Sequence, residues 1–167
     1  MNKAAFFDRD GTINVNTGHL CEPEKLRFVP GAPELIRRYN ELGYLVIVAT
    51  NQAGIAKGYY TQEQMHTLHV VMNERLEWEY GAHIDAFYFC PHHPDYTGPC
   101  HCRKPETGML EQAAADWQIN LSQSVMFGDK PHDVECARRA GVAGRLIQEE
   151  LGLTDRRQWD ITGGENT

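Results

Sequence analysis

Residues 3–12 read KAAFFDRDGT, an apolar run that changes abruptly into acids, an arginine and a glycine. A continuous apolar run of this length is typical of a strand buried on both faces of a parallel sheet. The polar residues after it would then lie at the carboxyl end of the strand, where ligands bind in sheets of this kind. This stretch therefore predicts both a buried strand and the position of a functional site.

The rest of the chain alternates apolar runs with segments of helical periodicity. Strands are expected at residues 44–50, 84–90, 124–129 and 142–147, and helices at 33–43, 61–80, 108–117 and 131–141. Thr61 begins a Thr-x-x-Gln capping pattern. Alternating strands and helices predict a doubly wound, Rossmann-like α/β fold with a parallel sheet and helices on both faces. One domain is expected over 1–152, and a loosely ordered tail over 153–167, where periodicity fades.

Charge and hydropathy exclude several classes of partner. The chain has 16 Lys and Arg residues against 23 Asp and Glu residues, a net charge of −7, which gives no basic surface for nucleic acid. It has no run of eighteen apolar residues, and residues 1–12 turn acidic too early for a signal peptide. We expect a cytoplasmic monomer that binds a small molecule and neither nucleic acid nor membrane.

Carboxylates gather at the predicted strand ends. Asp8 and Asp10 follow the first strand, and Asp129 follows the fourth. Carboxylates brought close together repel one another unless a cation lies between them, and hard oxygen ligands suit Mg²⁺. Thr50 and Lys104 would add a hydroxyl and an ammonium, so the set is suited to a phosphoryl group. Taken alone, Asp-x-Asp is more often a solvated turn rich in acids than a catalytic motif.

Three cysteines and a histidine lie close together in the sequence. Cys90, His92, Cys100 and Cys102 form the pattern Cys-x-His-x7-Cys-x-Cys. Two tight pairs of thiolate and imidazole ligands predict a closed, structural Zn²⁺ site, with unligated thiols as the alternative. Such a site would fix the adjacent Arg103 and Lys104 in space.

Four motifs occur in the order found in the haloacid dehalogenase (HAD) superfamily of phosphohydrolases: FFDRDGT, VATN, CRKP and GDKPHD. With TNQAGIAKG, CPHHP and CHCRKP, the chain resembles a narrower group, the D-glycero-D-manno-heptose-1,7-bisphosphate 7-phosphatases and the related histidinol-phosphate phosphatases. The resemblance implies a phosphomonoesterase without a large cap domain, acting on a small phosphorylated sugar. Histidinol phosphate is the alternative substrate. A phospho-acceptor signalling module is the alternative from another class.

The resemblance also implies roles for the residues of the motifs. Asp8 would be the nucleophile that forms an aspartyl-phosphate, and Asp10 the general acid and base. In an extended segment Asp8 and Asp10 project to the same side, so both can face one phosphate, and the intervening Arg9 is expected to point away. Thr50 and Lys104 would hold the phosphoryl oxygens.

A Mg²⁺ ion would be bound by Asp8, the backbone carbonyl of Asp10, and Asp129. The role of Asp133 stays open, because it could bind the metal, orient Lys104, or favour the start of a helix.

The resemblance further implies substrate contacts in the loops around the site. The candidates are Asn16, Thr17, Gly18, His19, Asn51, Gln52, Arg103 and Lys130.

Overall fold

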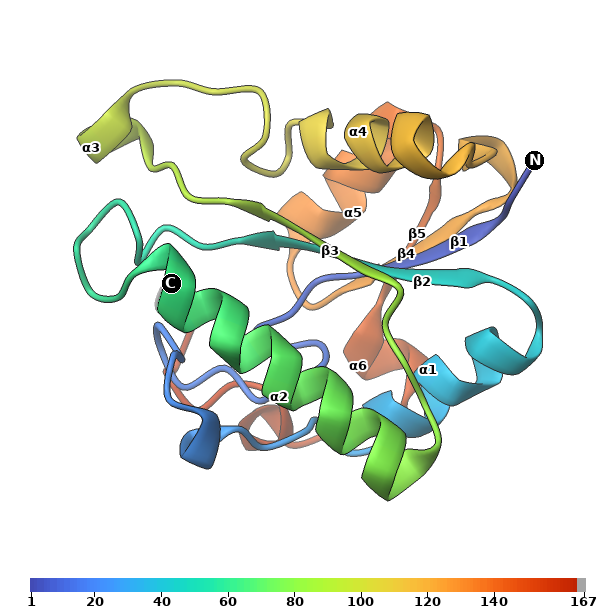
Figure 1. Cartoon of the computed structure of the whole chain (residues 1–167), viewed down its shortest axis with the longest axis horizontal. Helices are drawn as coiled ribbons and strands as arrows, with labels where there is room; N and C mark the ends of the chain where they lie inside the picture. The colour runs from blue at the N-terminus through green and yellow to red at the C-terminus, as the bar shows by residue number, and fades with distance from the viewer. Residues whose placement is uncertain (165–167) are drawn as a thin grey trace.

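Five parallel strands form the central sheet of the computed structural model, which describes residues 1–164 (Figure 1). They are β1 (Ala4–Phe7), β2 (Leu45–Asn51), β3 (Ala86–Cys90), β4 (Val125–Gly128) and β5 (Ala143–Leu146). Their order across the sheet is β3-β2-β1-β4-β5. The chain runs outward from β1 to one edge and then returns to β4 on the other side of β1. The crevice at the carboxyl ends of β1 and β4 is therefore the expected ligand site.

Helices cover both faces of the sheet because successive side chains of β1 point to opposite sides. Ala5 and Phe7 pack with α1 (Ala32–Glu41), α2 (Gln62–Tyr80) and α6 (Ile147–Glu150). Ala4 and Phe6 pack with α4 (Gly108–Trp117) and α5 (Pro131–Ala140). Figure 1 shows these two layers of helices above and below the sheet. All four β1 side chains are completely buried, which explains why the strand contains only apolar residues.

The structure confirms the predicted doubly wound α/β fold, and each predicted strand and helix is present with bounds shifted by a few residues at most. Helix α2 begins as predicted: the Thr61 hydroxyl accepts from the Gln64 backbone, and the Gln64 side chain accepts from the Thr61 backbone. No separate cap domain is present within residues 1–164. No helix in this range combines the length and apolar character needed to cross a membrane.

Short elements in the loops were not anticipated from the sequence. They are α3 (Pro94–Thr97), α6, and three 3-10 helices, η1 (Pro23–Lys25), η2 (Leu121–Gln123) and η3 (Arg156–Gln158). Each is too short to show helical periodicity, which needs several turns to become visible.

The segment after residue 152 packs against the body of the protein, unlike the loosely ordered tail predicted for 153–167. The Asn16 backbone donates to the Trp159 carbonyl at 2.8 Å, and the Ile161 backbone donates to the Asn16 carbonyl at 3.0 Å. The Trp159 ring packs on a small cluster formed by Val15, Val29 and Ala32. A few side chains and the β-bridge between Asn16 and Asp160 hold this segment. Such contacts need no regular apolar pattern, so the periodicity of the sequence does not reveal them. Residues 165–167 of that prediction lie outside the described residues.

Replacing Trp159 with alanine should lower the free energy of unfolding by about 1–3 kcal/mol, less than for a fully buried tryptophan because the ring is only partly buried. Trp78 is 91% exposed, so Trp78→Ala is a matched control that should change the free energy of unfolding by at most about 0.5 kcal/mol. Urea unfolding of both variants measures the difference. Equal effects would show that Trp159 does not hold the final segment.

Candidate active site

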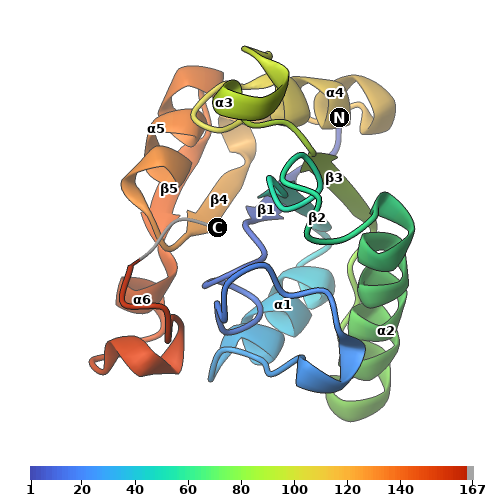
Figure 2. The same ribbon diagram turned by 90° about the vertical axis from the view of Figure 1, so that its left-hand side faces the viewer.

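Six predicted site residues converge at the carboxyl ends of β1, β2 and β4, the end of the molecule seen in Figure 2. This end is surrounded by the loops after β1 and β2, the segment containing α3, and the segment that follows α6. Every one of the six residues is at most 8% exposed, although all carry polar groups. They are Asp8, Asp10, Thr50, Lys104, Asp129 and Asp133.

Lys104 lies between two carboxylates. Its Nζ donates to Asp8 Oδ1 at 2.8 Å and to Asp133 Oδ1 at 2.7 Å. The other oxygen of Asp133 accepts from the Lys130 backbone at the start of α5. Asp133 therefore contacts both Lys104 and the start of α5, which agrees with two of the three roles that the sequence left open for this residue.

Asn51, predicted to contact substrate, holds the backbone of Lys104. Its Oδ1 accepts from the Lys104 N–H at 3.0 Å, and its Nδ2 donates to the Lys104 carbonyl at 3.4 Å. Because Asn51 ends β2, this pair of hydrogen bonds fixes the lysine loop to the sheet.

Three carboxylates form a group suited to a cation. Asp8, Asp129 and Asp133 each offer an oxygen, and these oxygens lie within 4.8 Å of one another. Burial and the Asp133 charge raise the pKa of Asp8 to about 6, against the opposing effect of Lys104. Burial and the charges of Asp8 and Asp133 raise the pKa of Asp129 to about 9. A Mg²⁺ ion would relieve this repulsion, and buried carboxylate oxygens are the ligands it prefers.

Gly11 allows the loop after β1 to approach this group. Its φ is +84°, and a Cβ there would lie 2.2 Å from Asp129 Oδ2. A side chain at this position would therefore push Asp129 away from Asp8.

Asp10 lies outside this group of three carboxylates and is held by three donors. Arg9, Asn14 and Gln52 all donate to its carboxylate, at 2.9 Å, 3.0 Å and 3.0 Å for the shortest contacts. Burial alone would raise the pKa of Asp10, but the Arg9 charge and these hydrogen bonds outweigh it, and the pKa lies below its usual value. The expectation that Arg9 points away was wrong. Its long side chain bends back to the adjacent carboxylate and is completely buried.

Gln52 joins Asp10 to the next strand. Its Nε2 also donates to Thr50 Oγ1 at 2.9 Å, and its Oε1 accepts from the Tyr60 hydroxyl. The roles of Arg9, Asn14 and Tyr60 around Asp10 were missed from the sequence, because nothing in their spacing signals that they meet.

The remaining residues that were predicted to bind substrate are either buried or partly exposed. Asn16 is 1% exposed, and its Oδ1 accepts from the Gly18 backbone, so it shapes the loop after β1. The His19 ring packs edge-on against Tyr59, with ring centroids 4.7 Å apart. Residues that stay partly exposed and free to contact a ligand are Thr17, Gly18, His19, Arg103 and Lys130.

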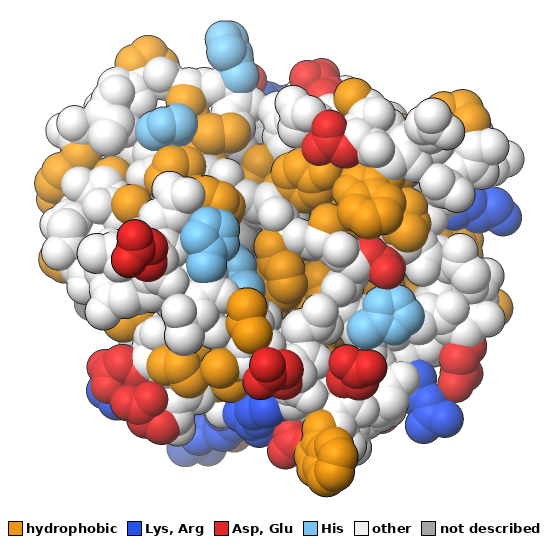
Figure 3. All heavy atoms as spheres, viewed as in Figure 1, with side chains coloured by type: hydrophobic (Ala, Val, Ile, Leu, Met, Phe, Trp, Pro, Cys, Tyr) orange, Lys and Arg blue, Asp and Glu red, His pale blue; other side chains and the backbone are white. Residues whose placement is uncertain are grey.

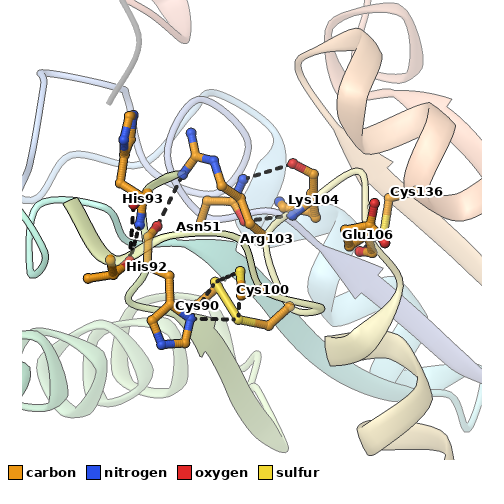
Figure 4. The surroundings of a disulfide bond; sticks show 11 residues. Asn51, Cys90, His92, His93, Cys100, Arg103, Lys104, Glu106 and Cys136 are labelled. Carbon is orange, nitrogen blue, oxygen red and sulfur yellow. Dashed lines mark hydrogen bonds between the residues drawn. A yellow bond between two sulfur atoms is a disulfide. The ribbon is translucent and has the colours of Figure 1, made fainter. Parts of the chain in front are cut away.

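The four predicted zinc ligands also come together (Figure 4). Cys90 Sγ lies 3.6 Å from His92 Nδ1 and 3.6 Å from Cys100 Sγ, and Cys102 Sγ lies 3.3 Å from His92 Nδ1 and 3.7 Å from Cys100 Sγ. Ligands at the corners of a zinc tetrahedron are about 3.6–3.8 Å apart, from bond lengths of about 2.0–2.3 Å. The cluster is thus compatible with zinc.

Cys90 and Cys102 are joined as a disulfide in this structure, whereas the sequence analysis expected thiolates. A bond between these two sulfurs and their ligation of zinc exclude each other, because two thiolates bound to one zinc lie about 3.8 Å apart and bonded sulfurs about 2.05 Å apart. Zinc would require the reduced pair, because the thiolate is the ligand.

Comparison with known proteins agrees with the site. A family model described as HAD-hydrolase-like matches residues 101–165, and the ordered motifs and parallel sheet are those of this class of hydrolases. A D-glycero-beta-D-manno-heptose-1,7-bisphosphate 7-phosphatase from Haemophilus ducreyi is 39% identical over 149 residues, covering 87% of this chain and 82% of the relative. A D-glycero-D-manno-heptose-1,7-bisphosphate 7-phosphatase from Thermosynechococcus vestitus is 43% identical over 157 residues, covering 89% and 80%.

A solved structure extends the agreement to three dimensions. The D,D-heptose 1,7-bisphosphate phosphatase from B. bronchiseptica, crystallised with magnesium and phosphate, matches with a TM-score of 0.80 at 33% identity, covering 87% of this chain and 80% of that one. The chain belongs to the D-glycero-D-manno-heptose-1,7-bisphosphate 7-phosphatase family of the HAD superfamily, as its motifs indicated.

The raised pKa values of Asp8 and Asp129 predict how pH affects Mg²⁺ binding. Without metal, these two carboxyls hold more protons in the folded protein than in the unfolded chain between pH 3.8 and about 9, so their contribution to stability falls as the pH rises through this range. Mg²⁺ competes with these protons and binds more tightly at higher pH. A fixed Mg²⁺ concentration should therefore raise Tm more at about pH 8.5 than at about pH 6.5.

Thermal unfolding with EDTA or with Mg²⁺ at each pH checks this. Asp129→Asn is the control and should lose the pH-dependent part of the rise in Tm that Mg²⁺ causes. If Mg²⁺ raised the Tm of the unsubstituted protein equally at both pH values, the result would argue against a cation site formed by Asp8 and Asp129.

Proposed function

We propose that this protein is a Mg²⁺-dependent phosphomonoesterase that removes the 7-phosphate of D-glycero-D-manno-heptose 1,7-bisphosphate. The observation that carries the proposal is the buried group of Asp8, Lys104, Asp129 and Asp133, in a chain whose relatives are named for this activity. These relatives are named for the heptose substrate, which favours it over histidinol phosphate.

Asp8 is the proposed nucleophile. One of its carboxylate oxygens attacks phosphorus, the bond from phosphorus to the sugar oxygen breaks, and an aspartyl-phosphate forms. Asp10 gives its proton to the departing sugar oxygen, then takes a proton from the water that hydrolyses the intermediate. The Arg9 charge and the hydrogen bonds that lower the pKa of Asp10 favour its ionised form in the free protein, so Asp10 must take up a proton from solvent when substrate binds. The phosphate dianion beside it would raise its affinity for that proton.

The neighbouring groups would stabilise charge on the phosphate. Lys104, held by Asp133, and the Thr50 hydroxyl are placed to hold the oxygens that are not transferred. Asp8, Asp129 and the backbone carbonyl of Asp10 would bind Mg²⁺, which when bound neutralises negative charge on the phosphoryl oxygens.

The substrate is a small phosphorylated sugar on this proposal. Arg103 and Lys130 stay partly exposed and supply positive charge for its second phosphate, and Thr17, Gly18 and His19 would contact the sugar. On the face drawn in Figure 3, lysine and arginine side chains lie in small groups among acids and form no continuous basic surface. This supports a small ligand over nucleic acid.

We further propose that the enzyme works as a monomer in the cytoplasm. Both ligand groups found in residues 1–164 come from one chain, so the site needs no second copy. A bisphosphorylated sugar does not cross a bilayer unaided, because burying its charges is costly, so the enzyme is expected where this sugar is made.

The proposal is tested with a substrate panel in the presence of Mg²⁺: the heptose 1,7-bisphosphate, sugar monophosphates, histidinol phosphate and p-nitrophenyl phosphate. The heptose bisphosphate should give the highest kcat/KM. Asp8→Asn should reduce kcat on every substrate to below about a hundredth, because an amide of the same shape cannot attack phosphorus.

Asp95→Asn, at a side chain that is 83% exposed, is the matched control and should keep full activity. Substantial turnover by Asp8→Asn would contradict the nucleophile role. A preference for histidinol phosphate would contradict the substrate.

We also propose that Cys90, His92, Cys100 and Cys102 bind one structural Zn²⁺ in the reduced protein. Protein purified under reducing conditions should contain about one zinc per chain. Cys100→Ser should lower Tm and kcat/KM together, because the cluster anchors the loop that carries Lys104.

Cys21→Ser, outside the cluster, should change neither. Reduced protein without zinc, or a Cys100 variant with unchanged Tm and activity, would contradict the zinc site.

A further inference from the structure

Arg9 is a completely buried cation, so each of its donors needs an acceptor inside the protein. Nε and Nη2 donate to the Asp10 carboxylate at 3.2 Å and 2.9 Å, and Nη2 also donates to the Leu20 carbonyl at 3.1 Å. The remaining nitrogen, Nη1, lies 3.2 Å from Nε2 of His69. His69 therefore supplies an acceptor to Nη1, the guanidinium nitrogen that contacts no other acceptor within the described residues.

The direction of this contact fixes the state of His69. A guanidinium has donors only, so Nε2 must accept, and the neutral ring carries its hydrogen on Nδ1. Burial and the Arg9 charge lower the pKa of His69 to about 3, in agreement with a neutral ring. The ring stacks on Phe87, with centroids 4.2 Å apart and an interplanar angle of 10°, which fixes its plane.

Packing alone does not account for a histidine at this position. His69 is 3% exposed, and its Nδ1 has no hydrogen-bond partner within the described part of the chain. An apolar side chain would fill the same space without burying an unpaired donor. The imidazole differs from an apolar side chain here in that it supplies a hydrogen-bond acceptor for Arg9.

We propose that His69 is a positioning residue for the reaction: by accepting from Arg9, it holds the guanidinium on the Asp10 carboxylate and so keeps the acid-base residue in place. This inference rests on the role proposed above for Asp10. Without the acceptor, Nη1 would be a buried donor with no partner, and the guanidinium would tilt from its contact with both Asp10 oxygens. The step that depends on Asp10, protonation of the departing oxygen, would suffer most.

Two amide variants separate this role from packing. The Oε1 of His69→Gln can reach the place of Nε2 and accept from Arg9, whereas the amide of His69→Asn ends near the place of Nδ1 and cannot. His66→Asn is the control, because His66 is exposed on the same helix and does not bond Arg9. kcat and KM are measured with a sugar phosphate, whose alkoxide needs a proton, and with p-nitrophenyl phosphate, whose leaving group does not.

His69→Asn should lower kcat on the sugar phosphate about tenfold or more, and kcat on p-nitrophenyl phosphate by less than about threefold, with little change in KM. His69→Gln should recover most of the lost rate, and His66→Asn should match the unsubstituted protein. If His69→Asn does not fold, His69→Phe takes its place, since it keeps the stacking on Phe87 and lacks the acceptor.

Equal losses on both substrates, no loss, or no recovery by His69→Gln would overturn the proposal. Asp10→Asn is measured in parallel to locate a failure. If Asp10→Asn loses more on the sugar phosphate and the His69 variants do not, the inference about His69 alone is wrong. If Asp10→Asn shows no such preference, the acid role of Asp10 fails, and the role of His69 fails with it.

Discussion

The buried ion pairs of Lys104 join the parts of the chain that make the site. The ammonium contacts Asp8 at the end of β1 and Asp133 in the first turn of α5, and its backbone is bonded to Asn51 at the end of β2. A buried charge is tolerated only when it is paired, so these three segments must meet for Lys104 to be buried at all. The position of the proposed nucleophile thus depends on a lysine almost a hundred residues away.

The site contains two separate systems of charge. On one side, Asp8, Asp129 and Asp133 crowd together, and their mutual repulsion suits a cation. On the other side, Asp10 is surrounded by donors that favour its ionised form. Two carboxylates that stand two residues apart in one motif therefore acquire opposite pKa shifts, because one faces acids and the other faces Arg9. Their different proposed roles follow from this difference in surroundings.

The fold and the positions of the acids could be predicted from the sequence, because buried parallel strands read as continuous apolar runs and their ends are marked by polar residues. The contacts made by long side chains could not. The alternation of side chains along a strand wrongly predicted that Arg9 points away from Asp10. Alternation fixes the direction of the Cβ atom but not the position of the guanidinium at the end of a flexible side chain. The hydrogen bonds of Asn51 to the backbone of Lys104 are also a contact that only the folded chain reveals. The docking of Trp159 likewise depends on a cluster formed by distant residues.

The pairing of β1 with β4 also bears on when the enzyme becomes active during synthesis. Ala5 pairs with Val125, so the middle of the sheet forms only after residues made late by the ribosome are available. The loop after β1 likewise pairs, at Asn16, with Asp160. Until then, β1 can pair only with β2, and Asp8 has neither Asp129 nor Asp133 beside it. Such long-range pairing slows folding, and it also means that a nascent chain ending before β4 lacks Asp129 and Asp133, two of the three grouped carboxylates. Catalytic competence would then arise in one late step, once both halves of the sheet have joined.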